Sequence, residues 1–361
     1  MTAIAAVAGT LAVAAPSAVA APGPDAVQQK LDALVRVDGA PGALGSVRHP
    51  DGRTRTYTAG VGDVGTGAKV PRDGQVRIGS NTKTFTAVVV LQLVGEGRIR
   101  LDTPVEEYLP GAVDGTGITV RQLLQHTSGL PDYTRHLDDE VRPYQPRELL
   151  DIALRHPADF APGEKWAYSN TNYVLAGLVV QEVTHRPLAA EIDRRIIRHL
   201  GLRHTYFPAP GEATIREAHP HGYYRESADG PLIDITEMDP SWAWAAGQLV
   251  STTSDLNRFF GALVGGRLLR PAQLAEMQRT VDAGKPFAPG SKYGLGLVSS
   301  PLSCGGVHWG HGGSIPGYET RGGATGDGRA ANITITVQPG DEATARHLEA
   351  AVDTALCAMK G

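Results

Sequence analysis

The sequence has no surplus of positive charge. Its 34 lysines and arginines stand against 38 aspartates and glutamates, a formal net charge of −4. No segment carries the basic stripe that a nucleic-acid backbone or an anionic membrane surface would attract. We therefore expect no nucleic-acid partner.

Low-complexity segments and internal repeats are also lacking. The 44 glycines and 25 prolines are scattered along the 361 residues, without the strict period of a collagen or the clustering of a linker. Because 41% of the residues are apolar, the chain can bury a sizeable hydrophobic core. An intrinsically disordered chain and a fibrous protein are therefore excluded. The length allows about two domains of ordinary size.

Only the beginning of the chain contains an apolar stretch of notable length. No charged residue precedes Asp25, and residues 3–20 are rich in alanine, valine and leucine. The stretch is too weakly apolar for a transmembrane anchor, whereas Ala18-Val19-Ala20 before Ala21 is typical of a cleavage site. We expect residues 1–20 to be a signal peptide, and the mature protein to be secreted, without a membrane span.

The sequence has 2 cysteines, Cys304 and Cys357. An even count in an exported chain favours a disulfide, and two buried thiols that act as small hydrophobes are the alternative. A disulfide over so long a loop would stabilise the fold by about 4 kcal/mol. It would tie the last segment to the strand region before it.

The apolar periodicity predicts strands near both ends of the chain and helices between them. Predicted strands cover residues 42–48, 53–61, 293–298, 306–309, 318–322 and 331–337, and predicted helices cover 27–35, 82–94, 120–124, 148–154, 173–183, 192–200 and 342–359. One sheet built from both termini, with helices on its faces and a helical insertion, is the economical α/β architecture. The domains would then be residues 22–75 with 245–361, and 76–244.

Ser80 and Lys83 stand at the start of the predicted helix 82–94. A spacing of three places both side chains on one helical face, where a lysine of lowered pKa can take the proton of a serine nucleophile. Alone, the pair is better explained as a helix cap followed by a surface lysine.

Tyr168 and Asn170 follow Pro162-Gly163, where a loop leads into the next helix. Asparagine is rare in this chain, so a Tyr-x-Asn motif is more specific than the serine and lysine pair. A helix cap beside a packed tyrosine is the alternative. The third motif, His311-Gly312-Gly313-Ser314, follows a predicted strand, and its small residues would let a substrate lie against the strand edge. Alone, it is better explained as a turn.

Taken in this order, the three motifs resemble those of the penicillin-recognising serine hydrolases. This superfamily includes class C beta-lactamases, DD-peptidases, D-aminopeptidases and related esterases, with the signatures Ser-x-x-Lys, Tyr-x-Asn and Lys/His-x-Gly. The resemblance covers residues 41–357 and is greatest to secreted actinomycete D-alanyl-D-alanine carboxypeptidases. It implies a beta-lactamase/DD-peptidase-like fold, an antiparallel sheet flanked by helices with a mainly helical part inserted. The two cysteines also match the family's disulfide pair.

The resemblance implies a role for each matching residue. Ser80 attacks the carbonyl and forms an acyl-enzyme, and Lys83 and Tyr168 share the proton handling. Asn170 orients the substrate amide and Lys83. The backbone N–H groups of Ser80 and Ser314 form the oxyanion hole.

Further family positions concern binding rather than proton transfer. His311 supplies a polar group, neutral or positive, where other members carry lysine. Trp242 resembles an aromatic pocket wall, and Gly312 and Gly313 line the substrate strand. His126 matches a family segment that looks structural, so no catalytic role is assigned to it.

The chain departs from the carboxypeptidase pattern where those enzymes hold the substrate's terminal carboxylate. Gly312 stands in place of a threonine, and Val298 in place of an arginine. An unpartnered carboxylate in a dry pocket is costly, so release of a terminal D-alanine requires that Arg321 or Lys292 substitute. The loop between Tyr133 and Tyr144 also looks short, which predicts a more open cleft.

The leading hypothesis is a penicillin-acylated serine hydrolase, with D-Ala-D-Ala carboxypeptidase or transpeptidase action. The expected ligands are a small peptide or a peptidoglycan-type D-amino-acid substrate, and beta-lactams. The alternatives are a D-aminopeptidase, D-amino-acid amidase, esterase or class C-type beta-lactamase, and a non-catalytic penicillin sensor. No cofactor is needed for acyl transfer. Neither His219 with His221 nor His308 with His311 has the spacing of a zinc site. The oligomeric state is left open.

Overall fold

A computed structural model describes residues 25–113, 115–138, 142–227, 230–285 and 287–359. The predicted signal peptide lies outside the described residues. The helices are α1 (Ala26–Arg36), α2 (Asn81–Gly95), α3 (Val120–Gln125), α4 (Pro146–Leu154), α5 (Thr171–Thr184), α6 (Leu188–Ile192), α7 (Arg198–Leu200), α8 (Trp244–Gly247), α9 (Thr253–Val264), α10 (Pro271–Met277) and α11 (Glu342–Cys357). Short 3-10 turns cover Val105–Glu107, Tyr133–Arg135 and Pro240–Trp242, and a π-helical stretch over Asp193–Ile197 joins α6 to α7.

An antiparallel sheet forms the centre of the molecule. Its strands are β1 (Gly42–Arg48), β2 (Thr54–Gly60), β7 (Val281–Asp282), β8 (Lys292–Tyr293), β9 (Val298–Pro301), β10 (Val307–Gly310), β11 (Gly313–Ile315), β12 (Tyr318–Ala324) and β13 (Ala330–Ile335). They are ordered β2-β1-β13-β12-β10-β9-β8-β7, with β11 also paired to β12. Two small ladders pair β3 (Val76–Arg77) with β6 (Val250–Ser251) and β4 (Tyr223–Tyr224) with β5 (Ile233–Asp234).

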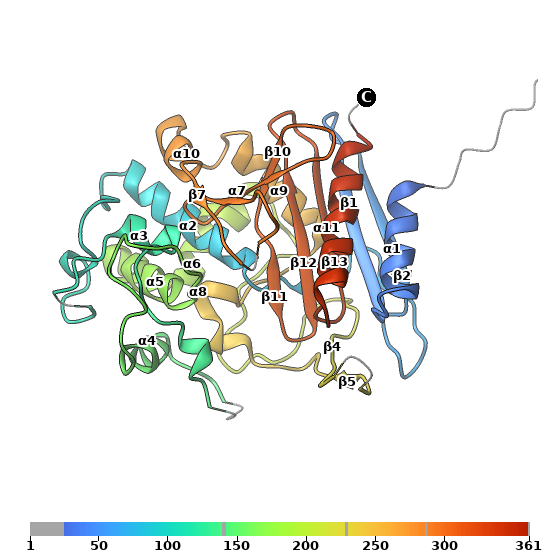
Figure 1. Cartoon of the computed structure of the whole chain (residues 1–361), viewed down its shortest axis with the longest axis horizontal. Coiled ribbons are helices and arrows are strands. Elements are labelled where there is room, and N and C mark those ends of the chain that lie inside the picture. Colours follow the sequence, from blue (N-terminus) through green and yellow to red (C-terminus); the bar gives the residue numbers. More distant parts are fainter. Residues whose placement is uncertain (1–24, 114, 139–141, 228–229, 286, 360–361) are drawn as a thin grey trace, which may run out of the picture.

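Both ends of the chain contribute to this sheet. β1 lies between β2 and β13, with Ala43 opposite Ile335, so the blue and red strands of Figure 1 are neighbours. This confirms the predicted α/β class and the antiparallel sheet flanked by helices. The predicted domain boundaries stay a prediction.

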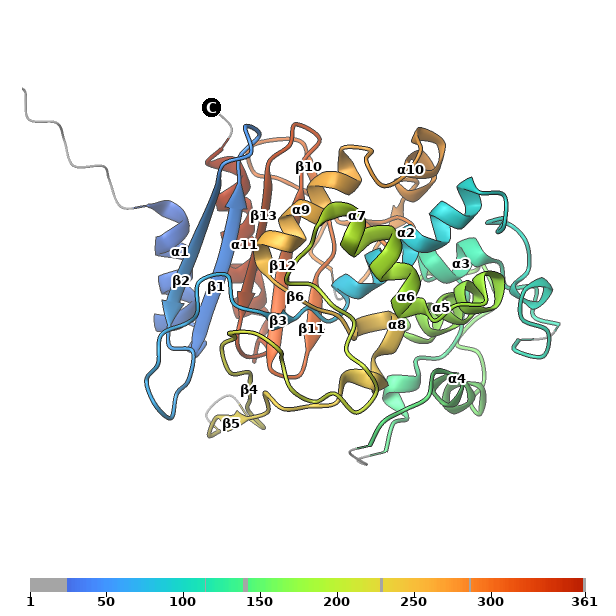
Figure 2. The same cartoon turned by 180° about the vertical axis from the view of Figure 1, so that it is seen from behind.

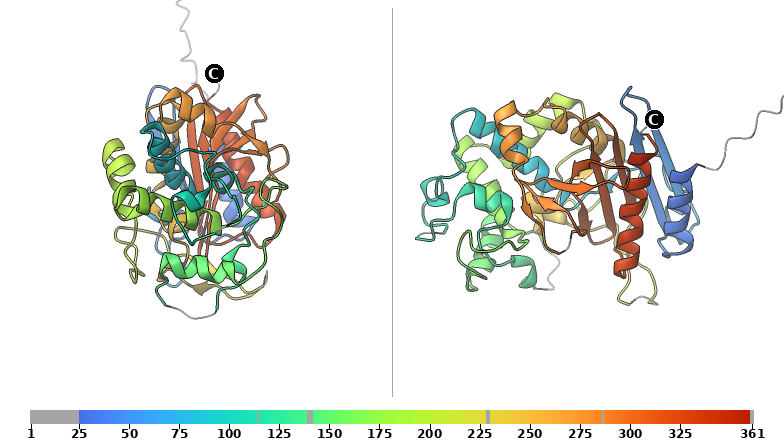
Figure 3. Two further views of the ribbon diagram at one scale, coloured as in Figure 1. Left: turned by 90° about the vertical axis from the view of Figure 1, so that its left-hand side faces the viewer. Right: turned by 45° about the horizontal axis from the view of Figure 1, so that its top comes forward.

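Helices cover both faces of the sheet. On one face, α1 and α11 enclose a core that contains Leu31, Ile333, Ile335 and Leu348. On the other face, α9 packs across β1, β13 and β12, as Figure 2 shows from behind. The mainly helical part lies beside the sheet, toward the end of the molecule away from α1 (Figure 3).

Helix α2 begins at the nucleophile candidate and is buried on all sides. Phe85 stacks on Phe259 of α9, with ring centroids 3.7 Å apart. Its threonines are buried but satisfied: Thr84 donates to Gly296 O at 2.8 Å, and Thr86 donates to Ala245 O at 2.9 Å. Because buried hydroxyls without partners are costly, these contacts hold α2 against both the sheet and the helical part.

The predicted strand 293–298 is wrong, because this segment is a tight hairpin between β8 and β9. Tyr293 pairs with Val298, and Gly294 N–H donates to Leu297 O at 2.7 Å. Gly296 has φ +75°, and a Cβ on Gly294 would lie 2.1 Å from Met277 O. The apolar alternation arises because Leu295 and Leu297 are both buried, not because the segment is extended.

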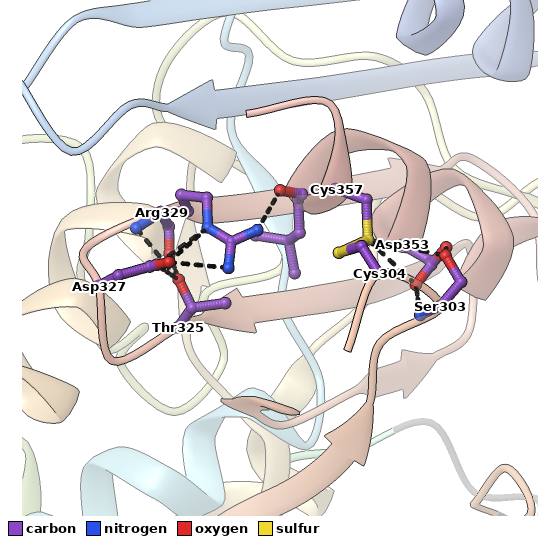
Figure 4. The surroundings of a disulfide bond; sticks show 8 residues. Ser303, Cys304, Thr325, Asp327, Arg329, Asp353 and Cys357 are labelled. Atoms are coloured by element: carbon purple, nitrogen blue, oxygen red, sulfur yellow. Dashed lines mark hydrogen bonds and ion pairs between the residues drawn. A yellow bond between two sulfur atoms is a disulfide. The ribbon is translucent and has the colours of Figure 1, made fainter. Parts of the chain in front are cut away.

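The predicted disulfide is present. Cys304 and Cys357 are bonded, with their Cα atoms 5.7 Å apart and a sequence separation of 53 residues. Figure 4 shows that Ser303 and Asp353 reinforce the junction, with Ser303 N–H donating to Asp353 at 2.7 Å. The end of α11 is thereby fastened to the β9–β10 turn. Among the described residues, no helix combines the length and apolarity needed to cross a bilayer.

Candidate active site

The turn that carries Ser80 is packed directly against β11. Gly79, at φ +49°, has no room for a side chain, because a Cβ there would lie 2.8 Å from Ser314 O. On the facing strand, a Cβ on Gly313 would lie 1.9 Å from Ile78 O. Two glycines therefore let the nucleophile turn and the strand with Ser314 meet backbone to backbone.

The Ser80 hydroxyl is held by Lys83 rather than used as a helix cap. Lys83 Nζ donates to Ser80 Oγ at 2.9 Å, to Asn170 Oδ1 at 2.7 Å and to Ala246 O at 2.8 Å. The lysine is fully buried. Burial lowers the pKa of Lys83 to about 7, although the negative charge of Asp132 opposes this shift. A substantial fraction of the lysine is thus neutral and able to accept a proton at neutral pH.

Asn170 connects the lysine to a carboxylate that sequence analysis missed. Asn170 Oδ1 accepts from Lys83, and Asn170 Nδ2 donates to Asp132 Oδ2 at 3.0 Å. Asp132 caps the 3-10 turn at Tyr133. The residues are 38 positions apart, so no local motif links them.

Tyr168 completes the group around the serine. Its ring centroid lies 4.9 Å from Lys83 Nζ. Burial raises the pKa of the Tyr168 phenol, and a hydrogen bond with the Ser80 side chain opposes that shift. The phenol is therefore neutral at neutral pH and available as a proton donor.

His311 lies behind the site in a neutral form. Its Nδ1 is 2.5 Å from Gly312 O, and its Nε2 is 3.0 Å from the Tyr293 hydroxyl. Burial lowers the pKa of His311 to about 3, and the charge of Lys83 contributes in the same direction. Sequence analysis left the charge of this group open, and the structure assigns it none.

Two cavities meet at Ser80, Tyr168 and Ser314. The first has a volume of about 630 Å³ and includes Asn170 and the predicted pocket wall Trp242. The second has a volume of about 710 Å³ and includes Val298, His311, Gly312 and Arg321. A carbonyl at Ser80 would therefore have one substituent in each cavity. Residues 139–141 of the loop between Tyr133 and Tyr144 lie outside the described residues, so the predicted openness of the cleft stays a prediction.

Arg321 lies where sequence analysis sought a carboxylate partner, but it is already paired. Its guanidinium contacts the buried Glu319 and lies 3.7 Å from Glu349 on α11. A Cβ on Gly312 would lie 2.8 Å from Arg321 Nη1, so this glycine makes room for the arginine. Lys292 lines neither cavity and instead lies 3.7 Å from Asp282.

The structure brings Ser80, Lys83, Tyr168, Asn170 and Ser314 together, with Trp242 and Arg321 in opposite cavities. Gly313 is buried beneath the strand and packs on the nucleophile turn. Besides Asp132, sequence analysis missed Tyr293, whose hydroxyl lies between His311 and His126. Its place in a run read as a strand gave no signal of this contact. Within the described ranges, no group of three or more His, Cys, Asp or Glu side chains could hold a metal ion.

Comparison with known proteins gives consistent matches. A family model described as Beta-lactamase matches residues 27–355. Penicillin-binding protein 4 of Amycolatopsis lactamdurans is 31% identical over 268 residues, which cover 70% of this chain and 69% of that protein. Putative penicillin-binding protein PbpX of Bacillus subtilis is 29% identical over 245 residues, 67% of this chain and 56% of that protein. The chain thus spans little more than half the length of the second relative.

Two solved structures of similar fold are described as an amidohydrolase and an amidase. A D-stereospecific amidohydrolase from Streptomyces sp. has a TM-score of 0.82 and 40% identity, over 90% of this chain and 97% of that one. The D-amino acid amidase of Ochrobactrum anthropi, in complex with D-phenylalanine, has a TM-score of 0.82 and 30% identity, over 92% and 98% of the two chains.

Proposed function

Because the chain belongs to the Beta-lactamase family, we propose that it is a serine hydrolase that is acylated at Ser80 by D-amino acid amides and related short D-peptides. One observation carries this proposal: Nζ of the buried Lys83 lies 2.9 Å from Ser80 Oγ, and the pKa of this lysine is lowered to about 7. The nucleophile and its base are in place without substrate. The similar amidohydrolase and amidase structures support the class of substrate.

Acylation follows from the positions of three groups. Lys83 Nζ takes the Ser80 proton as Oγ attacks the substrate carbonyl. Backbone N–H groups of Ser80 and Ser314 stabilise the oxyanion, and the neutral Tyr168 phenol donates a proton to the leaving nitrogen. Lys83 then returns its proton to the Tyr168 oxygen. The net result is transfer of one proton from the serine to the leaving amine.

Deacylation uses the same groups with water in place of the amine. The acyl group stays on Ser80, with its side chain in the first cavity beside Trp242 and Asn170. Water enters through the second cavity, which the amine has left. Tyr168 takes the proton of the attacking water as it passes its own proton to the neutral Lys83, and Lys83 returns that proton to Ser80 Oγ as the acid is released.

The charge of the second cavity favours a neutral leaving group over a carboxylate. Among the described residues, its charged lining comprises Glu342, Glu349, Asp353, Arg321 and Arg346. Each arginine is near a glutamate: Arg321 beside Glu349, and Arg346 3.6 Å from Glu342. A terminal carboxylate would have to compete with these glutamates for a guanidinium, whereas ammonia or a neutral amide would not.

The first experiment compares four kinds of substrate. We expect turnover of D-alaninamide and D-phenylalaninamide, much slower turnover of their L enantiomers, and a higher kcat/KM for an acyl-D-Ala-D-Ala amide than for the free acid. Faster turnover of the free acid would support the D-Ala-D-Ala carboxypeptidase instead. That second candidate is favoured by the position of Arg321 in the second cavity and by the penicillin-binding relatives.

Glu349→Gln tests the charge argument directly. Arg321 keeps its contact with Glu319 but loses the second anion, so its charge is less neutralised on the cavity side and the ratio of kcat/KM for the free acid to that for the amide should rise roughly threefold to tenfold. Glu342→Gln is the matched control, because Glu342 lines the same cavity but pairs with Arg346. An equal ratio in both variants would remove the basis for this selectivity.

Binding of penicillin and location outside the cytoplasm are parts of the same proposal. The first is supported by the penicillin-binding relatives and is tested by mass spectrometry of the Ser80 peptide after exposure to labelled penicillin. The second is supported by the charge-free, alanine-rich residues 1–24 and by the disulfide. Expression of the full chain and analysis of the culture medium tests it. Absence of any Ser80 adduct, together with no amide turnover, would favour a non-catalytic protein.

A further inference from the structure

A buried tyrosine between two histidines lies directly behind the candidate active site. Tyr293 on β8 is fully buried, and so are His126 and, almost completely, His311. The Tyr293 hydroxyl is 3.1 Å from His126 Nε2 and 3.0 Å from His311 Nε2. The proposed acylation steps do not use this tyrosine.

Backbone groups fix the direction of every hydrogen bond in this chain of contacts. The Ser169 backbone N–H donates to His126 Nδ1 at 3.2 Å, so Nδ1 is the unprotonated nitrogen. The proton of a neutral His126 is then on Nε2 and is donated to the Tyr293 oxygen. Tyr293 must therefore donate its single hydroxyl proton to His311 Nε2. His311 in turn donates from Nδ1 to Gly312 O at 2.5 Å.

The hydrogen bonds that link Ser169, His126, Tyr293, His311 and Gly312 form a relay, whose two ends belong to opposite walls of the site. Ser169 stands between Tyr168 and Asn170, which contact Ser80 and Lys83. Gly312 precedes Gly313 and Ser314 of β11, the strand packed on the nucleophile turn. The relay thus connects the proton-transfer loop to the strand with the proposed oxyanion-hole donor, through side chains from different parts of the chain.

We propose that Tyr293 is a positioning residue of this site. Its hydroxyl fixes the distance between the Tyr168–Asn170 loop and the Gly312–Ser314 strand, and it holds His311 in the neutral tautomer protonated on Nδ1. Where related enzymes present a lysine, this chain thus presents an imidazole with both nitrogens occupied. The inference rests on the proposed acylation at Ser80.

Burial and two nearby positive charges oppose protonation of His311, and they outweigh the hydrogen bond to Gly312 O, which acts in the opposite direction on its pKa. Tyr168 and Phe287 pack near its ring, at centroid distances of 6.3 and 5.9 Å. The charged groups that act on it are Lys83 from α2 and Arg321 from β12, and both lower the pKa of the imidazole in addition to burial. Burial and Lys83 likewise lower the pKa of His126. A neutral hydroxyl bridge between two neutral rings is consistent with this environment.

Tyr293→Phe removes only the bridging oxygen. We expect kcat for D-alaninamide to fall roughly tenfold to hundredfold while KM changes less than about threefold, since misplacement of the reacting groups affects the transition state more than ground-state binding. Tyr318→Phe is the matched control. Tyr318 is also fully buried, and its hydroxyl donates to the Pro220 carbonyl at 2.8 Å, outside the relay. An equal fall in kcat in both variants would overturn the positioning role.

Nitrogen-15 NMR of the histidine side chains tests the relay without any substrate. In the wild-type protein, His311 should show the Nδ1–H tautomer and His126 the Nε2–H tautomer, with neither ring titrating at pH 5 to 8. In Tyr293→Phe, the His311 tautomers should become mixed. The opposite tautomers in the wild-type protein would overturn the proposal even if the variant fails to fold.

Labelling by a fluorophosphonate separates this inference from the proposed substrate class. This probe reacts with Ser80 as a serine nucleophile and needs no D-amino acid. If the wild-type protein turns over no amide, the proposed function fails, yet slower labelling of Tyr293→Phe than of Tyr318→Phe would still support the relay. Equal labelling rates for the wild-type protein and Tyr293→Phe would refute it.

Discussion

At the scale of single residues, the reactivity of Ser80 depends on how the charge of Lys83 is balanced. Burial disfavours the ammonium form, and Asp132 favours it by its negative charge. The neighbouring Tyr168 and Tyr173 rings face Nζ at 4.9 and 5.7 Å without offering a counter-charge. The pKa of Lys83 therefore falls to about 7, so about half of the lysine is neutral at pH 7.

Asp132→Asn should make Lys83 more easily deprotonated. The rising limb of kcat/KM against pH, which follows loss of the Lys83 proton, should lie near pH 7 in the wild-type protein. Because the variant removes the anion that stabilises the ammonium, this limb should shift to lower pH, by about one unit or less. A pH profile for D-alaninamide measures the shift.

The control for this prediction is Asp239→Asn. Asp239 lines the first cavity, but it accepts hydrogen bonds from the backbone N–H groups of Ser241 and Gly211 and makes no contribution to the pKa of Lys83. In Asp239→Asn, the rising limb of kcat/KM against pH should stay near pH 7, as in the wild-type protein. A shift of the Asp132→Asn limb to higher pH would contradict the assignment of Lys83 as the titrating base.

Contacts between neighbouring positions explain which residues could be predicted from the sequence. Ser80 and Lys83 are three positions apart on one helix, and Tyr168 and Asn170 belong to one loop, so their motifs predict them directly. Asp132 meets Asn170 from 38 positions away, and Tyr293 meets His126 from 167 positions away. Such contacts are set by tertiary packing, which no local pattern in a single sequence encodes.

At the scale of elements, the site depends on the close approach of the Ser80 turn to β11. Gly313→Ala should disrupt it, since the added Cβ would lie 1.9 Å from the Ile78 carbonyl oxygen, which is backbone and cannot rotate away. We expect loss of roughly 1–3 kcal/mol in the free energy of unfolding and a fall of about hundredfold in kcat. Urea denaturation and steady-state kinetics measure the two effects.

Gly312→Ala is the adjacent control with the opposite expectation. Its Cβ would meet the guanidinium end of Arg321 at 2.8 Å, and a long side chain at the edge of a cavity can move. The free energy of unfolding should change by less than about 0.5 kcal/mol. Equal destabilisation by both substitutions would contradict the idea that the Ile78 carbonyl in the Ser80 turn is what leaves no room for a Cβ at Gly313.

The hairpin at Gly294–Leu297 shows why element prediction failed where it did. Alternating glycine and leucine fits a strand as well as a turn that buries both leucines, and the difference lies in Gly296 at φ +75°. Helix α9 was not predicted either, although Leu256, Phe259, Phe260 and Leu263 are all buried along it. By contrast, the long strands β1 and β12 and helix α11 follow clear periodicities and were predicted within a few residues.

At the scale of the whole molecule, the sheet closes because the last strands return to the first. β13 lies between β1 and β12, and α11 covers the same face as α1. The disulfide fastens the end of α11 to the turn after β9, across a separation of 53 residues that includes β10 to β13. The same helix supplies Glu349 and Arg346 to the second cavity. Helix α11 therefore contributes both to the stability of the fold and to the part of the site that would hold the leaving group.

Replacement of both cysteines, Cys304→Ser with Cys357→Ser, should lower the free energy of unfolding by about 2–4 kcal/mol. For a loop of this length the chain-entropy model gives about 4 kcal/mol, and residual structure in the unfolded chain reduces the measured value. Guanidinium denaturation followed by circular dichroism measures it. Native kcat/KM should be retained at 25 °C, because Asp353 still accepts from Ser303 at 2.7 Å and Arg329 still donates to Leu356 O at 2.6 Å. A loss of activity without a loss of stability would instead show that the disulfide acts by positioning α11 at the second cavity rather than by constraining the unfolded chain.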